Sequence, residues 1–342
     1  MNIRSSVVAT LFLATASSGA LAQEAITLRL ADSLSNGHII HELVGKPLME
    51  GVTKATGGKV KFEHYPAEQL GKAKDLLALT QNGVADMAYI VPSYTSDKTP
   101  LTAVAELPGA FDTQCQGSLA VYALSHNGGI LETKEFASNK IRPLVTIALP
   151  AYQILLSSSR KVDSAKDLSG LKIRTAGGAM DLMVRSIGGV PVRMAAPEIF
   201  ESMSRGTLDG AVMSYQSVLS YDLDKLLKSG TVGMNFGTAI ITYSIGESKW
   251  QALPADVQKA LVQVGEATTR EACKRFEAAE QEAVDEVKAA GMQVISLSEA
   301  DRGTLAKAFA TVSEDWAKDL DKRGKPGSEA AKAFAEALNA NR

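Results

Sequence analysis

An arginine at the end of a short predicted strand is the residue in this sequence best placed to bind an anion. In the stretch DLSGLKIRTAGG, residues 172–174 favour a strand, and Gly177 and Gly178 precede a helix expected at residues 179–187. Arg174 would then lie where open α/β sheets bind ligands, at the carboxyl end of a strand and facing the next helix. Its guanidinium can pair with both oxygens of a carboxylate, and the helix N-terminus adds partial positive charge. The alternative is a solvent-exposed strand-end residue without a ligand.

The sequence contains no motif that assembles the active site of a common enzyme class. The patterns G-x-S-x-G, H-E-x-x-H, G-x-x-x-x-G-K-[ST] and G-x-G-x-x-G are absent. His38 and His41 could share one helix face, but the order HIIHE is not that of a zinc protease, and no further ligand pattern supports a metal. The serine run at residues 157–159 has no base nearby. We therefore expect a protein that is not an enzyme and that uses no metal or cofactor.

The first 22 residues have the features of a signal peptide. Arg4 gives a positive start, residues 7–16 form a short apolar run, and the sequence ALA ending at Ala22 has the form of a cleavage site. The run is shorter than the roughly 20 apolar residues that span a bilayer, and no later stretch approaches that length. We expect cleavage near Ala22 and an exported, soluble protein. The formal charge of −2, with acids and bases interspersed, suggests no nucleic-acid partner and no anionic membrane surface.

Two cysteines, Cys115 and Cys273, are the only ones in the chain. Export to an oxidising compartment permits a disulfide between them. However, residues so far apart in sequence need not be close in space, two cysteines form no framework, and buried free thiols are common. The sequence leaves open whether these residues are bonded.

Strand and helix patterns alternate along the first part of the chain. Strands are expected at residues 26–31, 59–65 and 86–91, with helices beginning near residue 38 and at residues 72–82. This alternation favours parallel sheets covered by helices.

Two further patterns indicate two lobes. The pattern GxxDxA follows a helical segment twice, at residues 83–88 and 206–211, as expected if two similar α/β units were present. Residues 254–290 then keep one helical pattern until Gly291, which corresponds to on the order of 50 Å of helix. That length exceeds the width of one lobe and would let a single helix brace both. The alternative is two helices joined by a kink.

Six stretches of the sequence resemble the extracytoplasmic solute-binding proteins of tripartite ATP-independent periplasmic (TRAP) transporters, the DctP-like family. The resemblance covers nearly all of the chain after the signal peptide, and the stretches are specific when taken together. They are TGGKVKFEHYPAEQLG at 56–71, NGVADMA at 82–88, ELPGAF at 106–111, DLSGLKIR at 167–174, GTLDG at 206–210 and WQALPADVQ at 250–258.

The resemblance implies an α/β protein with the two-lobe periplasmic-binding-protein (Venus-flytrap) fold and a long helix spanning both lobes. Lobe I would comprise residues 23–151 and 240–279, and lobe II residues 152–239 and 280–342. The implied function is to capture an organic acid between the lobes for ion-gradient-driven import. The implied partners are the small and large membrane subunits of the transporter, and most such proteins are monomers. A binding protein for a neutral or cationic solute, or a ligand-sensing protein for a receptor, remain alternatives.

The resemblance also implies which residues form the ligand site. Arg174 matches the family arginine that pairs with the ligand carboxylate. The residues that would line the pocket by matching position come from both lobes: Ser33, Ile90, Val91 and Tyr94 from the first, and Ala196, Met213 and Phe236 from the second or its crossing strand.

Departures from the family pattern suggest which acid is bound. A second arginine that members binding highly polar acids often carry is replaced by Ile154, and Met213 replaces the asparagine that usually follows the family sequence DGQE. Val91 and Tyr94 replace acidic and basic positions, so one charged anchor remains in an apolar pocket. We therefore expect a monocarboxylate with an apolar or aromatic body. The side chains offered as partners for an α-oxo or hydroxyl group are Tyr152, Tyr215 and Gln216.

Overall fold

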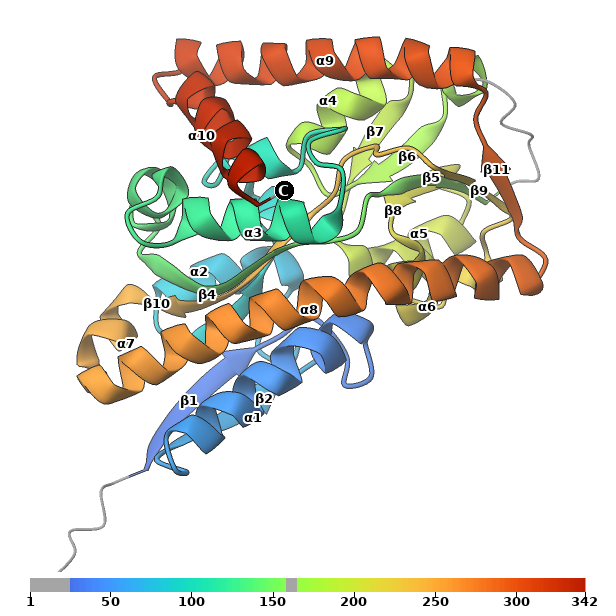
Figure 1. The fold of residues 1–342 in the computed structure, drawn as a ribbon. Coiled ribbons are helices and arrows are strands. Elements are labelled where there is room, and N and C mark those ends of the chain that lie inside the picture. Colours follow the sequence, from blue (N-terminus) through green and yellow to red (C-terminus); the bar gives the residue numbers. More distant parts are fainter. Residues whose placement is uncertain (1–24, 158–164, 342) are drawn as a thin grey trace, which may run out of the picture.

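The computed structural model describes residues 25–157 and 165–341. The expected signal peptide with its cleavage site at Ala22, and Ser158 and Ser159 of the serine run, lie outside these residues. No helix in the described part is both long and apolar enough to cross a membrane. The elements form two separate β-sheets with helices around them, as Figure 1 shows.

The first sheet has five strands in the order β2-β1-β3-β10-β4. β1 is parallel to β2 and β3, whereas β10 is antiparallel to β3 and β4. The strands are β1 (Ile26–Ala31), β2 (Val60–Tyr65), β3 (Met87–Ile90), β4 (Ile141–Ala148) and β10 (Ile240–Gly246). The helices between them are a π-helical turn η1 (His41–Gly45), α1 (Lys46–Ala55), α2 (Leu76–Gln81) and α3 (Gln114–Ser125).

The second sheet has six strands in the order β11-β9-β5-β8-β6-β7. β6 is parallel to both β7 and β8, and β5 is antiparallel to β8 and β9. The strands are β5 (Gln153–Leu156), β6 (Lys172–Thr175), β7 (Val190–Arg193), β8 (Gly210–Met213), β9 (Ser229–Val232) and β11 (Gln293–Ser296). Its helices are α4 (Ala179–Ser186), α5 (Ile199–Ser204) and α6 (Tyr215–Ser220).

The chain passes between the sheets in two segments that pair with each other. Residues 149–152 lead from β4 to β5, and residues 233–239 lead from β9 back to β10. The backbone N–H of Tyr152 donates to the carbonyl of Gly237 at 2.8 Å, and that of Phe236 donates to the carbonyl of Tyr152 at 3.2 Å. Two α/β lobes with crossing segments are thus present, which confirms the fold expected from the sequence.

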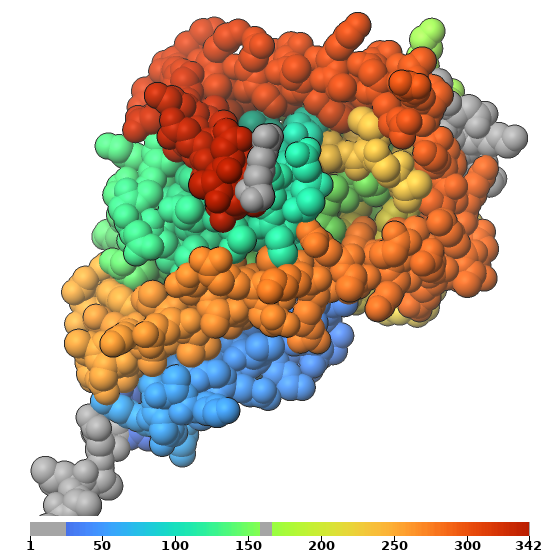
Figure 2. All heavy atoms as spheres, viewed as in Figure 1, coloured from blue at the N-terminus to red at the C-terminus, as the bar shows by residue number. Residues whose placement is uncertain are grey.

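One helix, α8 (Ala255–Ala289), runs along both lobes after the short helix α7 (Glu247–Ala252). It contacts α1, α3 and β4 on the first lobe and α6 and β11 on the second. Figure 2 shows α8 crossing the whole width of this face of the molecule. Gly265 allows the helix to lie close to β4, because a Cβ there would sit 2.1 Å from the carbonyl oxygen of Leu144. The expected long helix is therefore present without a break.

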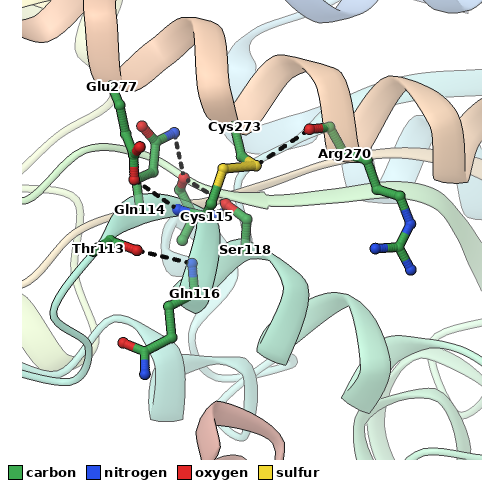
Figure 3. The surroundings of a disulfide bond; sticks show 9 residues. Thr113, Gln114, Cys115, Gln116, Ser118, Arg270, Cys273 and Glu277 are labelled. Carbon is green, nitrogen blue, oxygen red and sulfur yellow. Dashed lines mark hydrogen bonds between the residues drawn. A yellow bond between two sulfur atoms is a disulfide. The ribbon is translucent and has the colours of Figure 1, made fainter. Parts of the chain in front are cut away.

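A disulfide joins α3 to α8 and answers the question that the sequence left open. Cys115 and Cys273 are bonded, with their Cα atoms 4.9 Å apart (Figure 3). Beside the bond, the carboxylate of Glu277 on α8 accepts a hydrogen bond from the backbone N–H of Cys115 at 3.1 Å. This part of α8 is thereby fixed to the first lobe.

Two C-terminal helices complete the fold. α9 (Glu299–Lys322) packs against α4 of the second lobe, and α10 (Gly327–Ala340) packs against α9 and against α3. Because α3 packs on β4, α10 contacts the first lobe. The exact lobe boundaries expected from the sequence stay a prediction.

Candidate functional site

A narrow cavity lies between the lobes and is lined from both of them. The first lobe and its crossing segments contribute Ile40, Tyr89, Val91, Tyr94, Leu149, Tyr152, Ala239 and Ile241. The second lobe contributes Arg174, Ala176, Ala196, Met213, Ser217 and Tyr221. The space between these side chains is about 330 Å³, but water centres can reach only about 20 Å³ of it. That is room for one or two water molecules, so a larger ligand can enter only if the walls separate.

Arg174 contributes the charge in this cavity. It lies on β6, one residue before the end of the strand, and it is only 2% exposed, so the solvent-exposed alternative is wrong. Its Nε donates to the carbonyl oxygen of Met194 at 3.1 Å. Within the described residues, no carboxylate lies within 4.0 Å of its nitrogen atoms. Since a guanidinium keeps its charge and a buried charge is costly without a partner, this arrangement suits an anionic ligand.

The turn from β6 to α4 brings Arg174 close to the first lobe. Gly177 and Gly178 both have positive φ angles, 111° and 59°, which glycine adopts readily. A Cβ on Gly177 would also lie 2.8 Å from the carbonyl oxygen of Ser93 in the first lobe. The glycine pair predicted to open the helix thus also allows close contact between the lobes.

Four tyrosines surround the cavity together with Arg174: Tyr89, Tyr94, Tyr152 and Tyr221. Burial raises the pKa of Tyr89, Tyr152 and Tyr221 above the usual value, so these phenols are neutral at physiological pH. A neutral phenol can donate a hydrogen bond to a carboxylate while its ring packs against an apolar body.

Contacts between the lobes close the cavity. The hydroxyl oxygen of Tyr94, in the helical turn η3 (Pro92–Thr95), accepts a hydrogen bond from the backbone N–H of Ala196 at 2.9 Å. The backbone N–H of Ile39 donates to the hydroxyl of Ser220 at 3.3 Å. The rings of His38 and Tyr221 meet edge to face, with centroids 4.7 Å apart. These contacts require that the lobes be closed, as they are here.

Six of the residues predicted for the site line this cavity, and five do not. The six are Arg174, Val91, Tyr94, Tyr152, Ala196 and Met213. Side chains alternate along a strand, so Tyr89 and Val91 face the cavity, whereas Ile90 between them packs into a different cluster. The side chain of Gln216 is buried outside the lining, and its amide has no hydrogen-bond partner among the described residues.

The other three predicted residues are turned away from the cavity. Ser33 instead borders a shallow hollow on the surface. Tyr215 is fully buried, and its hydroxyl donates to the carbonyl of Thr231 at 2.9 Å. Phe236 is also fully buried, and its ring packs against Phe309 with the centroids 5.6 Å apart. Matching by spacing located these segments but not the direction of their side chains.

Sequence reasoning missed two of the tyrosines in the lining. Tyr89 could have been found, because it lies two residues before Val91 and a strand places such residues on one face. Tyr221 gave no such signal. It follows α6, and only the packing of that helix brings its ring to the cavity.

A larger surface hollow lies elsewhere, near Asp86 and Lys249 of the first lobe. It is lined by one lobe only, and Arg174 is not part of it. The narrow cavity with the buried arginine is therefore the better candidate for a ligand site.

Comparison with known proteins agrees with the fold. A solute-binding protein of Albidiferax ferrireducens is 26% identical over 310 residues, which cover 85% of this chain and 88% of that protein. The structure of a TRAP solute-binding protein from Rhodoferax ferrireducens, solved with copurified benzoate, has a TM-score of 0.85 at 24% identity and covers 92% of this chain and 98% of that one. A marine metagenome TRAP solute-binding protein, described as specific for aromatic acid ligands and solved with 3-hydroxybenzoate, also has a TM-score of 0.85 at 24% identity and covers 93% and 99% of the two chains.

The profile of one protein family matches most of the sequence. This family, the bacterial extracellular solute-binding proteins of family 7, also called DctP, matches residues 30–319. Its members are periplasmic binding proteins that serve transport and are not enzymes. They bind small organic acids and work with membrane subunits. The chain therefore belongs to the bacterial extracellular solute-binding proteins of family 7.

Proposed function

We propose that this protein is the substrate-binding subunit of a TRAP transporter and that it captures a monocarboxylate with an aromatic body. One observation carries the proposal. Arg174 is buried without a carboxylate partner among the described residues, in a cavity walled by tyrosines and aliphatic side chains. A ligand carboxylate supplies the missing counter-charge through two parallel hydrogen bonds.

The cavity walls favour an aromatic body over a more polar one. Val91 and Met213 offer no hydrogen bonds from their side chains, so a sugar acid would leave hydroxyls unpaired at a cost of roughly 1 to 3 kcal/mol each. Once the walls have separated to admit it, a flat ring can pack against the tyrosine rings. The benzoate and 3-hydroxybenzoate in the two similar structures support this class of ligand. A cationic solute is disfavoured because it would meet the uncompensated charge of Arg174.

The proposal places the protein in the periplasm as a monomer. The signal peptide, residues 1–22, is removed near Ala22. Residues 23–151 and 240–279 form the lobe that closes against residues 152–239 and 280–342. The closed form presents a surface to the small and large membrane subunits, which import the acid using an ion gradient. Ligand favours closure only through its contacts with both lobes, which Arg174 and Tyr94 provide from opposite sides.

The test is a thermal-shift screen of ligand-stripped protein against benzoate, 3-hydroxybenzoate and their amides. A ligand present at about a hundred times its Kd stabilises the folded state by about 2.7 kcal/mol, which a melting curve resolves. We expect shifts with the acids and none with the amides, because an amide lacks the charge that pairs with Arg174. Shifts confined to sugar acids or dicarboxylates would contradict the aromatic ligand, and shifts confined to amines would contradict the role of the arginine.

A further inference from the structure

A buried cluster of one carboxylate and two imidazoles lies in the first lobe, next to the cavity but outside its lining. Asp32 follows β1, His64 is on β2, and His41 is the first residue of η1. The Oδ2 atom of Asp32 lies 3.9 Å from Nδ1 of His41 and 3.7 Å from Nε2 of His64. Both distances are too long for hydrogen bonds. The three potential ligand atoms all lie within 4.8 Å of one another.

The two nitrogen atoms that face the carboxylate are unsatisfied. Neither Nδ1 of His41 nor Nε2 of His64 has a hydrogen-bond partner among the described residues. The side chain of Asp32 is fully buried, and that of His41 is only 6% exposed. Since nearly all buried polar atoms have a partner, such a group indicates a water molecule or an ion between these atoms.

Gly45 allows the ring of His41 and the hydroxyl of Tyr243 to pack close to the backbone of η1. A Cβ at that position would lie 3.1 Å from Nδ1 of His41 and 2.5 Å from the hydroxyl oxygen of Tyr243. That hydroxyl donates to Oδ2 of Asp32 at 2.9 Å, so it adds a further oxygen beside the cluster. The cluster thus combines two imidazole nitrogens, a carboxylate oxygen and a phenol oxygen.

We propose that Asp32, His41 and His64 bind a divalent cation of the zinc type. Zinc binds such nitrogen and oxygen atoms at about 2.0 to 2.2 Å, which places neighbouring ligand atoms about 3.3 Å apart. To reach this geometry, Oδ2 of Asp32 must approach each nitrogen by about half an ångström, and the two nitrogens, at most 4.8 Å apart, must approach each other by up to about 1.5 Å. The rings of His41 and His64 are stacked with their centroids 4.7 Å apart and their planes at 8°, so one ring must also turn for both nitrogens to face the ion. Two imidazoles in the set favour zinc over magnesium or calcium, which prefer oxygen ligands. The side chain of His64 is 16% exposed and gives the ion a route from solvent.

The bound ion ties together three segments of the first lobe. It links the end of β1 and the middle of β2 to η1. Ile40, the residue before His41, lines the ligand cavity. The ion therefore holds one wall of the cavity in place, but it does not touch the ligand and does not depend on which ligand is bound.

The test adds zinc to chelator-treated protein that carries no histidine tag and no organic acid, and it measures the zinc that stays bound after dialysis. We expect the wild type to retain one equivalent of zinc after dialysis and to bind cobalt with the visible absorption of a protein site. His64→Gln should weaken zinc binding by at least about 100-fold, since even residues that only support a zinc ligand can contribute that much. The matched control is His126→Gln, because His126 stacks on Tyr122 away from the cluster, and it should bind zinc like the wild type.

Two results would overturn the proposal. One is a folded wild type, checked by circular dichroism, that retains less than a stoichiometric amount of zinc. The other is equal zinc affinity in the wild type and in folded His64→Gln, which would show adventitious binding elsewhere. If His64→Gln does not fold, His41→Gln takes its place, and the wild-type measurement still decides. Neither result bears on the binding of organic acids, so the two proposals fail independently.

Discussion

At the scale of single residues, the guanidinium of Arg174 dominates the chemistry of the cavity. Its Nε is held by the carbonyl of Met194, so its two terminal nitrogens remain for a ligand. This geometry matters as much as the charge, because a planar guanidinium can bind both oxygens of a carboxylate and an ammonium cannot.

The first prediction concerns Arg174→Lys. We expect this change to weaken the binding of benzoate, or of the best acid from the screen, by about 10- to 100-fold, since one charge-assisted hydrogen bond and its geometry are lost. Isothermal titration calorimetry measures the affinity. The matched control is Arg270→Lys, an exposed arginine on α8 that pairs with Glu266, and it should bind as the wild type does. Equal affinities in the wild type and Arg174→Lys would remove the arginine from the site.

The sequence was informative about Arg174 for a physical reason that does not extend to its neighbours. A strand end followed by two glycines and a helix specifies a position in the fold, and Arg174 occupies it. Whether a side chain then faces the cavity depends on packing. Tyr215 and Phe236 are within or beside the right segments, yet their rings are directed into the protein core. Tyr221 reaches the cavity only through the placement of α6, which no local pattern encodes.

At the scale of elements, the long helix could be predicted and its covalent attachment could not. An unbroken apolar stripe specifies α8, and its length implies contact with both lobes. The distance between Cys115 and Cys273 depends instead on how α3 and α8 pack, and their sequence separation of 158 residues carries no information on that.

The second prediction concerns this disulfide. Replacing both cysteines by serine should lower the free energy of unfolding by about 2 to 4 kcal/mol, mainly because the unfolded chain gains freedom. Urea unfolding of the wild type and the double variant measures the difference. The wild type treated with a reductant should lose a similar amount, whereas the double variant should not respond to the reductant. Identical unfolding midpoints would show that the bond contributes nothing to stability.

At the scale of the whole molecule, a buried acid holds one of the segments that cross between the lobes. The carboxylate of Glu106 accepts a hydrogen bond from the hydroxyl of Ser93. It also accepts one from the backbone N–H of Ile240 at 3.1 Å. Its own carbonyl accepts from the backbone N–H of Thr238 at 3.3 Å. Glu106 thus connects the first lobe to the second crossing segment. Burial raises the pKa of its carboxyl from 4.5 to about 7.

The third prediction is that Glu106 makes the stability of the protein depend on pH. The carboxyl of Glu106 has a higher pKa in the folded protein than in the unfolded chain, so the proton it binds stabilises the folded state. This contribution is fully present below pH 4.5 and is lost as the pH rises through about 7. For such a pKa shift, the free energy of unfolding falls by on the order of 3 kcal/mol. Glu106→Gln does not titrate, so its stability relative to the wild type should increase between pH 5 and pH 8 in urea unfolding.

Two other buried acids titrate in the same pH range. The pKa values of Glu135 and Glu280 are also raised to about 7, and both residues titrate in the wild type and in the variant. The contribution of Glu280 cancels in the difference between the two proteins, whereas the charge of Glu135 helps to raise the pKa of Glu106, so the difference includes the repulsion between these two carboxylates. A stability difference between Glu106→Gln and the wild type that is constant over this pH range would show that Glu106 does not titrate as described.

The overall architecture was predictable because it follows from repeated local patterns. Alternating strands and helices correctly indicated the parallel strand pairs, and the recurring GxxDxA pattern indicated two α/β units. The prediction of parallel sheets was incomplete, because β10 and β5 run antiparallel to their neighbours and make both sheets mixed. What the patterns did not contain is where the lobes touch. The hydrogen bond from Ala196 to Tyr94 and the contact of His38 with Tyr221 join residues far apart in the chain, and each depends on the closed arrangement of the whole molecule.

The attachment of α8 to both lobes has a mechanical consequence. Glu277 binds the backbone of Cys115 on the first lobe, whereas Glu280, three residues later, accepts the backbone N–H groups of Tyr215 and Gln216 on the second lobe. These supports lie within one helical turn, a rise of about 4.5 Å. When one lobe rotates against the other, the torque on α8 is concentrated in that single turn. The helix must bend or twist there, or release one of its two supports, before the cavity can open.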